Sequence, residues 1–158
     1  MDLQKEYFRI PSAEDLSFVA DNMRHVDRVE VECLTGGMKP LLVLEKSVSN
    51  ADWALTWLDK NMEPMAIVGV SPGDQVFSSG CPWLLGTDAF GMSNARNILK
   101  NTMPLIHKMH EDYSVLWNRA WFENKTTIRW LEWGGFTMGA MEAWSGKTFV
   151  RFQRVRVN

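Results

Sequence analysis

The chain lacks the features that mark secreted, metal-binding and membrane proteins. Its 158 residues include two cysteines, Cys33 and Cys81, which are far apart and form no metal-ligand pattern. We therefore expect reduced thiols and no metal, with a disulfide as the alternative. No apolar run is long enough to span a bilayer, and the polar residues 1–6 lack the form of a signal peptide. These absences predict a protein of the cell interior, or one packaged inside a particle made in a cell.

A strong charge of either sign is also missing. Seventeen basic and 19 acidic side chains leave a net charge of −2, so no global basic field draws the protein to nucleic acid. A hydrophobic content of 46 % with 23 % charged residues is typical of a soluble globular protein. The length predicts one domain, residues 1–158, with a substantial core.

Tyrosine is scarce, with two residues, whereas tryptophan is frequent, with eight. A Trp side chain removes a large apolar area from water, so core filling is the simplest interpretation. A stacking surface for nucleic-acid bases is the alternative, and it needs Trp interleaved with Lys and Arg on one exposed face. Most of the Trp residues lie in apolar, strand-like segments, so we expect them in the core. Residues 148–157 predict an edge strand blunted by charge, and a local anion or nucleic-acid contact there stays open.

Hydrophobic periodicity and turn signals predict the order strand, helix, helix, strands, helix, strand, helix, strands. Ser12 and Asp15 have the spacing of a helix cap and first turn. Pro40 opens a second helix, and Pro104 should kink or split a long one. The expected strands are residues 8–10, 53–58, 65–70, 83–86, 115–122 and 148–157, with a break at 35–37, a turn at 71–74 and the long helix beginning near Ser93.

The most informative segment runs from residue 115 to residue 136. Its first part, Val115–Phe122, is apolar on both faces apart from two polar residues, which is typical of a central strand in a covered sheet. Asn124 can cap the helix that follows. Gly134 or Gly135 can adopt the left-handed conformation that closes this helix. The segment therefore predicts a buried strand, a short capped helix and a return into a further strand.

This order of strand, Asn-capped helix and Gly-Phe resembles the signature of the GNAT superfamily, the acetyl-CoA-dependent N-acyltransferases. The resemblance implies an α/β fold with a mixed, mostly antiparallel sheet, a central pair of splayed parallel strands, and helices on both faces. It also implies that the pantetheine arm of the cofactor lies between the splayed strands, and that backbone N–H groups at the start of the long helix hold the pyrophosphate. The implied activity is transfer of an acyl group to an amine of a protein or small molecule.

The phosphate-binding loop of the family has the pattern Gln/Arg-x-x-Gly-x-Gly/Ala, and its counterpart here is residues 86–96. Only Gly91 matches this pattern, while Asp88 would repel a diphosphate and Arg96 would offset its charge. We therefore expect weak binding of acetyl-CoA, with a salt-sensitive contribution from Arg96. The residues that the resemblance assigns to the cofactor are Leu85, Gly86, Thr87, Gly91, Ser93, Arg96 and Asn124.

Family members often place a Tyr seven residues after the Asn of the last helix, where it protonates the departing thiolate. The equivalent residue here is Leu131, which carries no such proton. The candidates for catalysis are then Asp88 and Asn118, the latter because its side chain should reach the gap between the strands. Asp27 and Glu30 would suit an acidic pair on the acceptor side, with a solvated turn as the simpler interpretation. Some enzymes of the family work through water and positioning alone.

A narrower resemblance is to small proteins of tailed bacteriophages, a group that includes the internal virion protein of short-tailed coliphages. It implies a phage protein of the host cytoplasm or virion interior, with other virion proteins as partners and a homodimer as an open alternative. Three functions therefore stay open: an N-acyltransferase, a non-catalytic virion or interaction protein on the same scaffold, and, from the Trp residues and the basic C-terminal strand, single-stranded nucleic-acid binding. The matching residues are Leu116, Trp117, Asn118, Trp121, Asn124, Ile128, Arg129, Leu131 and Gly135.

Overall fold

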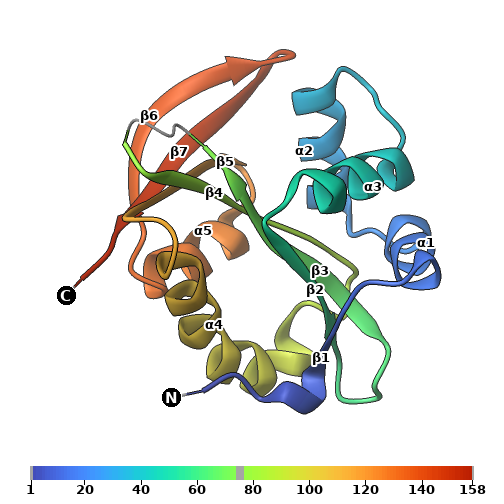
Figure 1. The fold of residues 1–158 in the computed structure, drawn as a ribbon. Helices are drawn as coiled ribbons and strands as arrows, with labels where there is room; N and C mark the ends of the chain where they lie inside the picture. Colours follow the sequence, from blue (N-terminus) through green and yellow to red (C-terminus); the bar gives the residue numbers. More distant parts are fainter. Residues whose placement is uncertain (1, 74–76, 158) are drawn as a thin grey trace.

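The protein is built around one seven-stranded sheet with helices on both faces (Figure 1). The computed structural model describes residues 2–73 and 77–157. The strands lie in the order β1-β2-β3-β4-β5-β7-β6, and every neighbouring pair is antiparallel except β4 and β5. Helices α1 to α3 cover one face of the sheet, and α4 and α5 cover the other. The expected α/β architecture, with a mostly antiparallel sheet and one parallel pair, is confirmed.

The elements follow one another with short connections. No helix in the described part of the chain is both long and apolar enough to cross a membrane. The elements are η1 Lys5–Tyr7, β1 Phe8–Arg9, α1 Ala13–Asp21, α2 His25–Thr35, α3 Pro40–Asn50, β2 Trp53–Leu58, β3 Pro64–Pro72, β4 Ser79–Gly86, η2 Met92–Asn94, α4 Ala95–His110, β5 Val115–Trp121, α5 Lys125–Trp133, β6 Thr137–Trp144 and β7 Lys147–Val155.

Local signals in the sequence account for the ends of several helices. The Ser12 hydroxyl accepts the Asp15 N–H at 3.1 Å while the Asp15 carboxylate accepts the Ser12 N–H, which completes a capping box at α1. At α5 the Asn124 side chain caps the first turn by accepting the Thr127 N–H. This helix closes with Gly135 at φ 90°, so the expected left-handed glycine is confirmed.

Two apolar clusters, one on each face of the sheet, form the core. The larger cluster joins the strands to α4 and α5 and includes the fully buried Trp57 and Leu116. The smaller cluster joins the sheet to α1, α2 and α3 around Val19 and Leu44. The expectation that most Trp residues fill the core is right for Trp57, which is fully buried. Trp53, Trp83 and Trp130 are partly buried and pack against the core, whereas Trp133 is exposed.

Three expectations about elements were wrong. The last strand is not at the edge, because β6 folds back along β7 and takes the edge position itself. Pro104 does not split the long helix, since α4 runs through it without a break, and the alternative of a kink stays a prediction. Residues 25–35 form the additional helix α2, where a turn was expected. The expected turn at residues 71–74 falls partly in β3, which extends to Pro72, and its last residue lies outside the described part of the chain.

Candidate functional site

The two parallel strands at the centre of the sheet separate after a single short contact. Strand β4 pairs with β5 at Ser79–Val115 and Gly80–Leu116 only. The next residue of β4 whose backbone faces β5 is Pro82, which has no N–H to continue the ladder. The sheet therefore opens into a gap that widens toward the C-terminal ends of both strands, as the resemblance implied.

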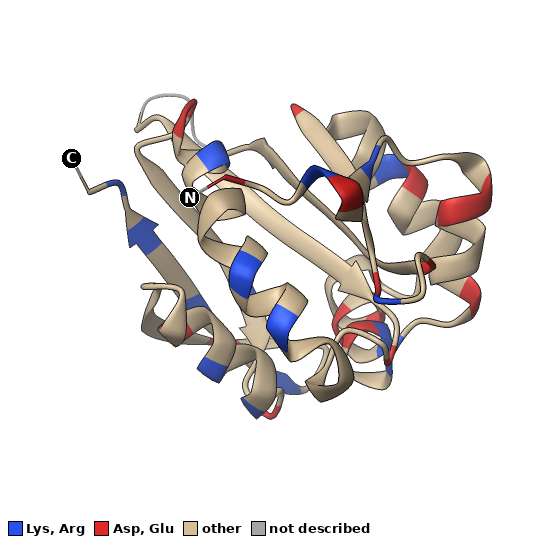
Figure 2. Cartoon of the chain, turned by 90° about the horizontal axis from the view of Figure 1, so that it is seen from below, with Lys and Arg blue, Asp and Glu red and all other residues tan. Residues whose placement is uncertain are grey.

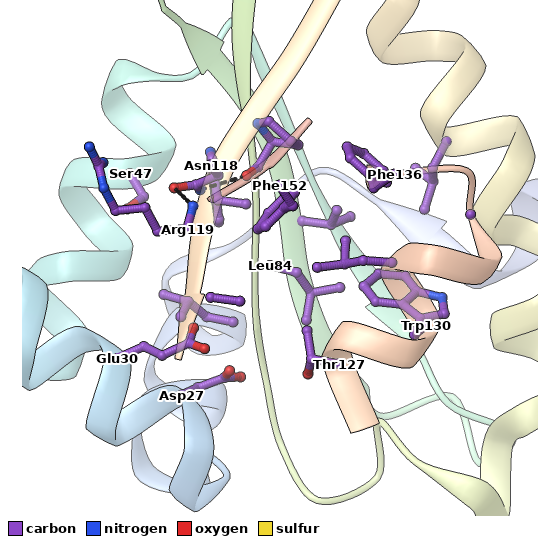
Figure 3. Close-up of a pocket in the computed structure, with 18 of the residues that line it drawn as sticks. Asp27, Glu30, Ser47, Leu84, Asn118, Arg119, Thr127, Trp130, Phe136 and Phe152 are labelled. Carbon is purple, nitrogen blue, oxygen red and sulfur yellow. Dashed lines mark hydrogen bonds between the residues drawn. The ribbon is translucent and has the colours of Figure 1, made fainter. Parts of the chain in front are cut away.

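The side chain of Asn118 spans the narrow end of this gap (Figure 3). Its Nδ2 donates to the Pro82 carbonyl at 2.8 Å, and its Oδ1 accepts the Arg119 N–H at 2.8 Å. In a continuous parallel ladder the Arg119 N–H would bond to the Pro82 carbonyl directly. The Asn118 amide is thus inserted between these two groups and holds the strands apart while satisfying both.

Two carboxylates from α2 occupy the wide end of the gap, which we call the mouth. Asp27 accepts the Gly86 N–H at the end of β4 at 2.7 Å, and Glu30 accepts the Trp121 N–H at the end of β5 at 2.9 Å. These are N–H groups that a continuous ladder would have paired across the strands. The interpretation of Asp27 and Glu30 as a solvated turn was therefore wrong, because both lie in α2 and both bond to the sheet.

One residue of β4 keeps its backbone groups unpaired beside the gap. Within the described residues, the Leu84 N–H and C=O have no hydrogen-bond partner, although Pro82 and Gly86 on either side do. Leu84 is half-buried in the wall of the cavity, and an amide that is removed from water without a partner is costly. Leu84 is therefore the position where a ligand carrying its own amide groups would complete the sheet.

The gap lies within a cavity of about 220 Å³ that passes between the strands. Its wall toward α4 and α5 is apolar and includes Leu105, Trp130 and Leu131. Its wall toward α2 and α3 carries the polar groups, among them Glu30 and Arg119 (Figure 3). Such a cavity suits an extended ligand whose stem is apolar and whose reacting end meets the polar wall.

Glu30 is the residue of the cavity whose chemistry is most altered by its surroundings. Burial and the negative charge of Asp27 raise the pKa of Glu30 to about 7, against the opposing effects of the Trp121 N–H, Asn124 and Arg24. Burial likewise raises the pKa of Asp27, although its ion pair with Arg24 opposes this. A carboxyl group with a pKa near neutrality can accept a proton at physiological pH and release it again.

Arg24 crosses the mouth of the gap. Its backbone N–H donates to the Gly86 carbonyl, and its guanidinium pairs with Asp27 at 2.7 Å. The guanidinium also lies 5.3 Å from the centre of the Phe90 ring and 3.4 Å from the Thr127 hydroxyl on α5. Arg24 thus links α2, β4 and α5 at the mouth, where its positive charge is paired with Asp27.

The residues assigned to the site from the sequence are only partly brought together. Leu85 and Asn118 line the cavity, whereas Asp88 is exposed and lines a separate pocket beside Thr87. Gly86 and Asn124 lie at the mouth, bonded to Asp27 and Glu30 respectively. Of the remaining positions, Gly91 precedes η2, Ser93 lies in η2 and Arg96 lies in the first turn of α4.

The structure adds Arg24 and Leu84 to the candidate residues, and it makes Glu30 the strongest candidate for a chemical role. The sequence offered a signal for Glu30, since two acids three residues apart share a helix face, but none for Arg24 or Leu84. Leu131 lines the cavity and is buried, and offers no proton there. Among residues 2–73 and 77–157, no group of three or more His, Cys, Asp or Glu is arranged to hold a metal ion.

The chain is similar to known proteins in its structure. No protein-family model matches the sequence, and no curated protein matches it significantly. A ribosomal-protein-alanine N-acetyltransferase from Brucella melitensis matches with a TM-score of 0.70 and 16 % identity, over 94 % of this chain and 99 % of that chain. A putative phosphinothricin N-acetyltransferase matches with a TM-score of 0.68 and 13 % identity, over 96 % of this chain and 98 % of that chain.

A third similar structure includes a cofactor. The spermidine N-acetyltransferase from Vibrio cholerae, in complex with CoA and spermine, matches with a TM-score of 0.68 and 14 % identity, over 94 % of both chains. At these identities the likeness concerns the fold and not the activity. The seven-stranded sheet, its one parallel pair and its two helical layers are those of the GNAT fold, which this chain adopts over almost its whole length.

Proposed function

We propose that this protein is an N-acyltransferase that uses acetyl-CoA to acetylate an amine. The observation that supports this most strongly is the gap between β4 and β5, with unpaired Leu84 backbone groups on one side and the Glu30 carboxylate on the other. The similar structures support the same class of reaction, since each is named as an N-acetyltransferase.

The residues of the gap fit the cofactor in two respects. The unpaired N–H and C=O of Leu84 match the amide groups of a pantetheine arm, and the apolar wall matches its aliphatic stretches. Arg24 and Arg96 would meet the phosphates, because Arg24 crosses the mouth and Arg96 lies in the first turn of α4. Asp88 and the single matching glycine of the loop remain unfavourable for a diphosphate, so we expect weak binding.

In this mechanism Glu30 is the base. Acetyl-CoA, when bound, supplies the thioester whose C–S bond is replaced by a C–N bond to the amine. Glu30 accepts the proton that the amine loses, which its pKa of about 7 allows at neutral pH. Asn118 holds the two strands at the separation that the gap requires. Water protonates the departing thiolate, because Leu131 has no proton to donate.

Release of free thiol from acetyl-CoA in the presence of a panel of primary amines tests the proposal. The parent protein should turn over at least one amine, and Glu30→Gln should reduce kcat by about 100-fold or more, the range of general base catalysis. Glu32→Gln is the matched control, because Glu32 is exposed two residues further along α2. The absence of thiol release with every amine tested would contradict the proposal.

The non-catalytic alternative keeps one observation in its favour. Arg24 and Phe90 narrow the mouth of the gap, and a scaffold protein would need no access there. The phage resemblance and the virion location remain predictions, since the comparisons do not bear on them. A role within a virion predicts no heat of binding when the protein is titrated with acetyl-CoA.

A further inference from the structure

Strands β5, β6 and β7 together carry a cluster of indole and guanidinium groups. The Arg151 guanidinium lies 4.3 Å from the centre of the Trp117 ring. The Arg119 guanidinium lies 5.2 Å from Trp117 and 5.0 Å from Trp144, between the two rings. We call these four residues the indole–arginine cluster. It interleaves Trp with Arg on a partly exposed surface, which is the pattern that the sequence alone could not place.

The cluster faces the polar wall of the cavity. Arg119 and Arg151 are directly paired between β5 and β7, so their side chains lie on one face of the sheet. The neighbouring pairs Asn118–Phe152 and Ala120–Val150 lie on the other face, toward the core under α4 and α5. Arg119 also lines the cavity, and Figure 3 shows it on the same side of the gap as Glu30. Arg119 therefore belongs both to the cluster and to the cavity wall that carries Glu30.

A carboxylate of the protein already shows what the cluster can bind. The Glu142 carboxylate accepts a hydrogen bond from Arg119 Nε at 2.6 Å and from Trp144 Nε1 at 3.0 Å. Its other oxygen lies 3.7 Å from Arg151 Nε. These contacts lower the pKa of Glu142, chiefly through Arg119.

Most of the donor capacity of the cluster remains available. Each guanidinium uses only its Nε toward Glu142, and among the described residues the terminal nitrogens of Arg119 and Arg151 have no hydrogen-bond partner. Planar guanidinium groups bind carboxylate and phosphate through such paired N–H groups. One acid faces two arginines, so the cluster keeps a net positive charge.

We propose that the amine acceptor also carries an anionic group, a carboxylate or a phosphate, which Arg119 and Arg151 hold beside Trp117 while the amine lies at Glu30. This inference rests on the proposed N-acyltransferase function. It specifies an anionic amine in preference to a neutral amine or a polyamine, because two arginines repel a polycation at the approach to the base.

Binding can be measured without catalysis through the indole N–H resonances of ¹⁵N-labelled protein. Titration with β-alanine or with phosphoethanolamine should shift the Trp117 and Trp144 signals, whereas propylamine and ethanolamine should leave them in place. Arg151→Gln should weaken this binding by about tenfold, the loss expected for one charge-assisted contact. Lys100→Gln is the control, since it removes the same charge from an exposed position on α4.

The two anionic probes distinguish carboxylate from phosphate as the preferred group. The inference would be overturned if neither probe shifts the indole signals. It would also be overturned if Lys100→Gln weakens binding of the probes as much as Arg151→Gln does. A third outcome would favour a nucleic-acid surface and overturn the inference. In that case a short single-stranded oligonucleotide at micromolar concentration shifts the same indole signals, and the small anionic amines do not.

Turnover then separates this inference from the proposed function. With thiol release as the readout, kcat/KM should be at least tenfold higher for β-alanine than for propylamine, and Arg151→Gln should remove most of this ratio. Turnover of neutral amines or spermidine in preference to anionic amines refutes the anionic acceptor and leaves the acyltransferase standing. No turnover of any amine refutes the acyltransferase, and the acceptor role with it.

Discussion

Glu30 has a raised pKa and lies in the wall of the cavity, and the pH dependence of the reaction should follow from its ionisation. Because a base must be deprotonated, kcat/KM should rise as the pH increases through about 7, the pKa of Glu30, and level off above it. Glu30→Gln should lose this limb of the profile, and Glu32→Gln should keep it. A parent profile that is flat between pH 6 and pH 8 would remove Glu30 from the role of base.

The Glu30 carboxyl group should also make the stability of the fold depend on pH, and stability should fall over the pH range in which activity rises. Its pKa is about 7 in the folded protein against an ordinary value of 4.5, so the folded state binds the proton more tightly than the unfolded chain does. This contribution to stability is present at pH 4.5 and is lost as the pH rises through 7. Glu30→Gln should therefore raise the melting temperature at pH 8 and change it little at pH 4.5, as measured by thermal unfolding at both pH values.

Asn118 should be needed for stability as well as for the shape of the gap. Asn118→Ala leaves the Pro82 carbonyl and the Arg119 N–H without partners, which should lower the free energy of unfolding by about 1–3 kcal/mol. Denaturant unfolding measures this difference. Asn50→Ala, at an exposed position at the end of α3, is the control and should change stability by less than about 0.5 kcal/mol. Equal losses in the two variants would show that the Asn118 amide does not hold the strands.

At the scale of elements, the end of α5 is the clearest case of sequence chemistry determining structure. The Gly135 N–H bonds to the Glu132 carbonyl and the Phe136 N–H to the Leu131 carbonyl, so the helix closes in a Schellman motif. Gly135 has φ 90°, and a Cβ added there would lie 3.0 Å from Arg154 Nε. Gly135→Ala should therefore cost about 1–2 kcal/mol for the left-handed backbone and more for the contact.

Gly146 provides a matched comparison for this prediction. It has φ 79° in the turn between β6 and β7, and a Cβ there would meet nothing within 4 Å. Gly146→Ala should show the backbone cost alone, so Gly135→Ala should be the more destabilising of the two in denaturant unfolding. A smaller loss for Gly135→Ala would show that Arg154 moves aside without cost.

The sequence predicted those elements that carry their own local signals. The capping box of α1, the opening of α3 at Pro40 and the cap of α5 at Asn124 are all side-chain chemistry within a few residues. Helix α2 has no such signal at its start, because Arg24 makes no side-chain cap and β-branched Val residues weaken its helix propensity, although Gly36 ends it in the left-handed conformation. Asp27 and Glu30 face the sheet, so interpreting them as solvated charges was wrong.

The position of β7 depended on information that lies outside the strand. Its arginines suggested an edge, but Arg154 donates to the Gly134 carbonyl and Arg151 lies beside Trp117 and Glu142. These partners come from α5, β5 and β6, which local periodicity does not bring together. The residues of the site were hidden for the same reason, since Leu84 and Arg24 acquire their significance only when β4 separates from β5.

At the scale of the whole molecule, the proposed function depends on one feature, the gap between two parallel strands of an otherwise continuous sheet. Pro82 ends the ladder, Asn118 spans its narrow end, and the acids of α2 bond to the strands at the mouth. Figure 2 shows basic residues along α4 and acidic residues gathered on the side of α1 and α2. An anionic cofactor should therefore approach from the α4 side, and its binding should weaken as salt is added.

The amide resonance of Leu84 tests the central claim most directly. If the gap holds the cofactor, titration of ¹⁵N-labelled protein with acetyl-CoA should shift the Leu84 N–H signal in a saturable way, because that group gains its first hydrogen-bond partner. The Leu85 N–H, which faces β3 within the sheet, should move much less. A Leu84 signal that stays in place at millimolar acetyl-CoA would contradict the claim that this gap is a cofactor site.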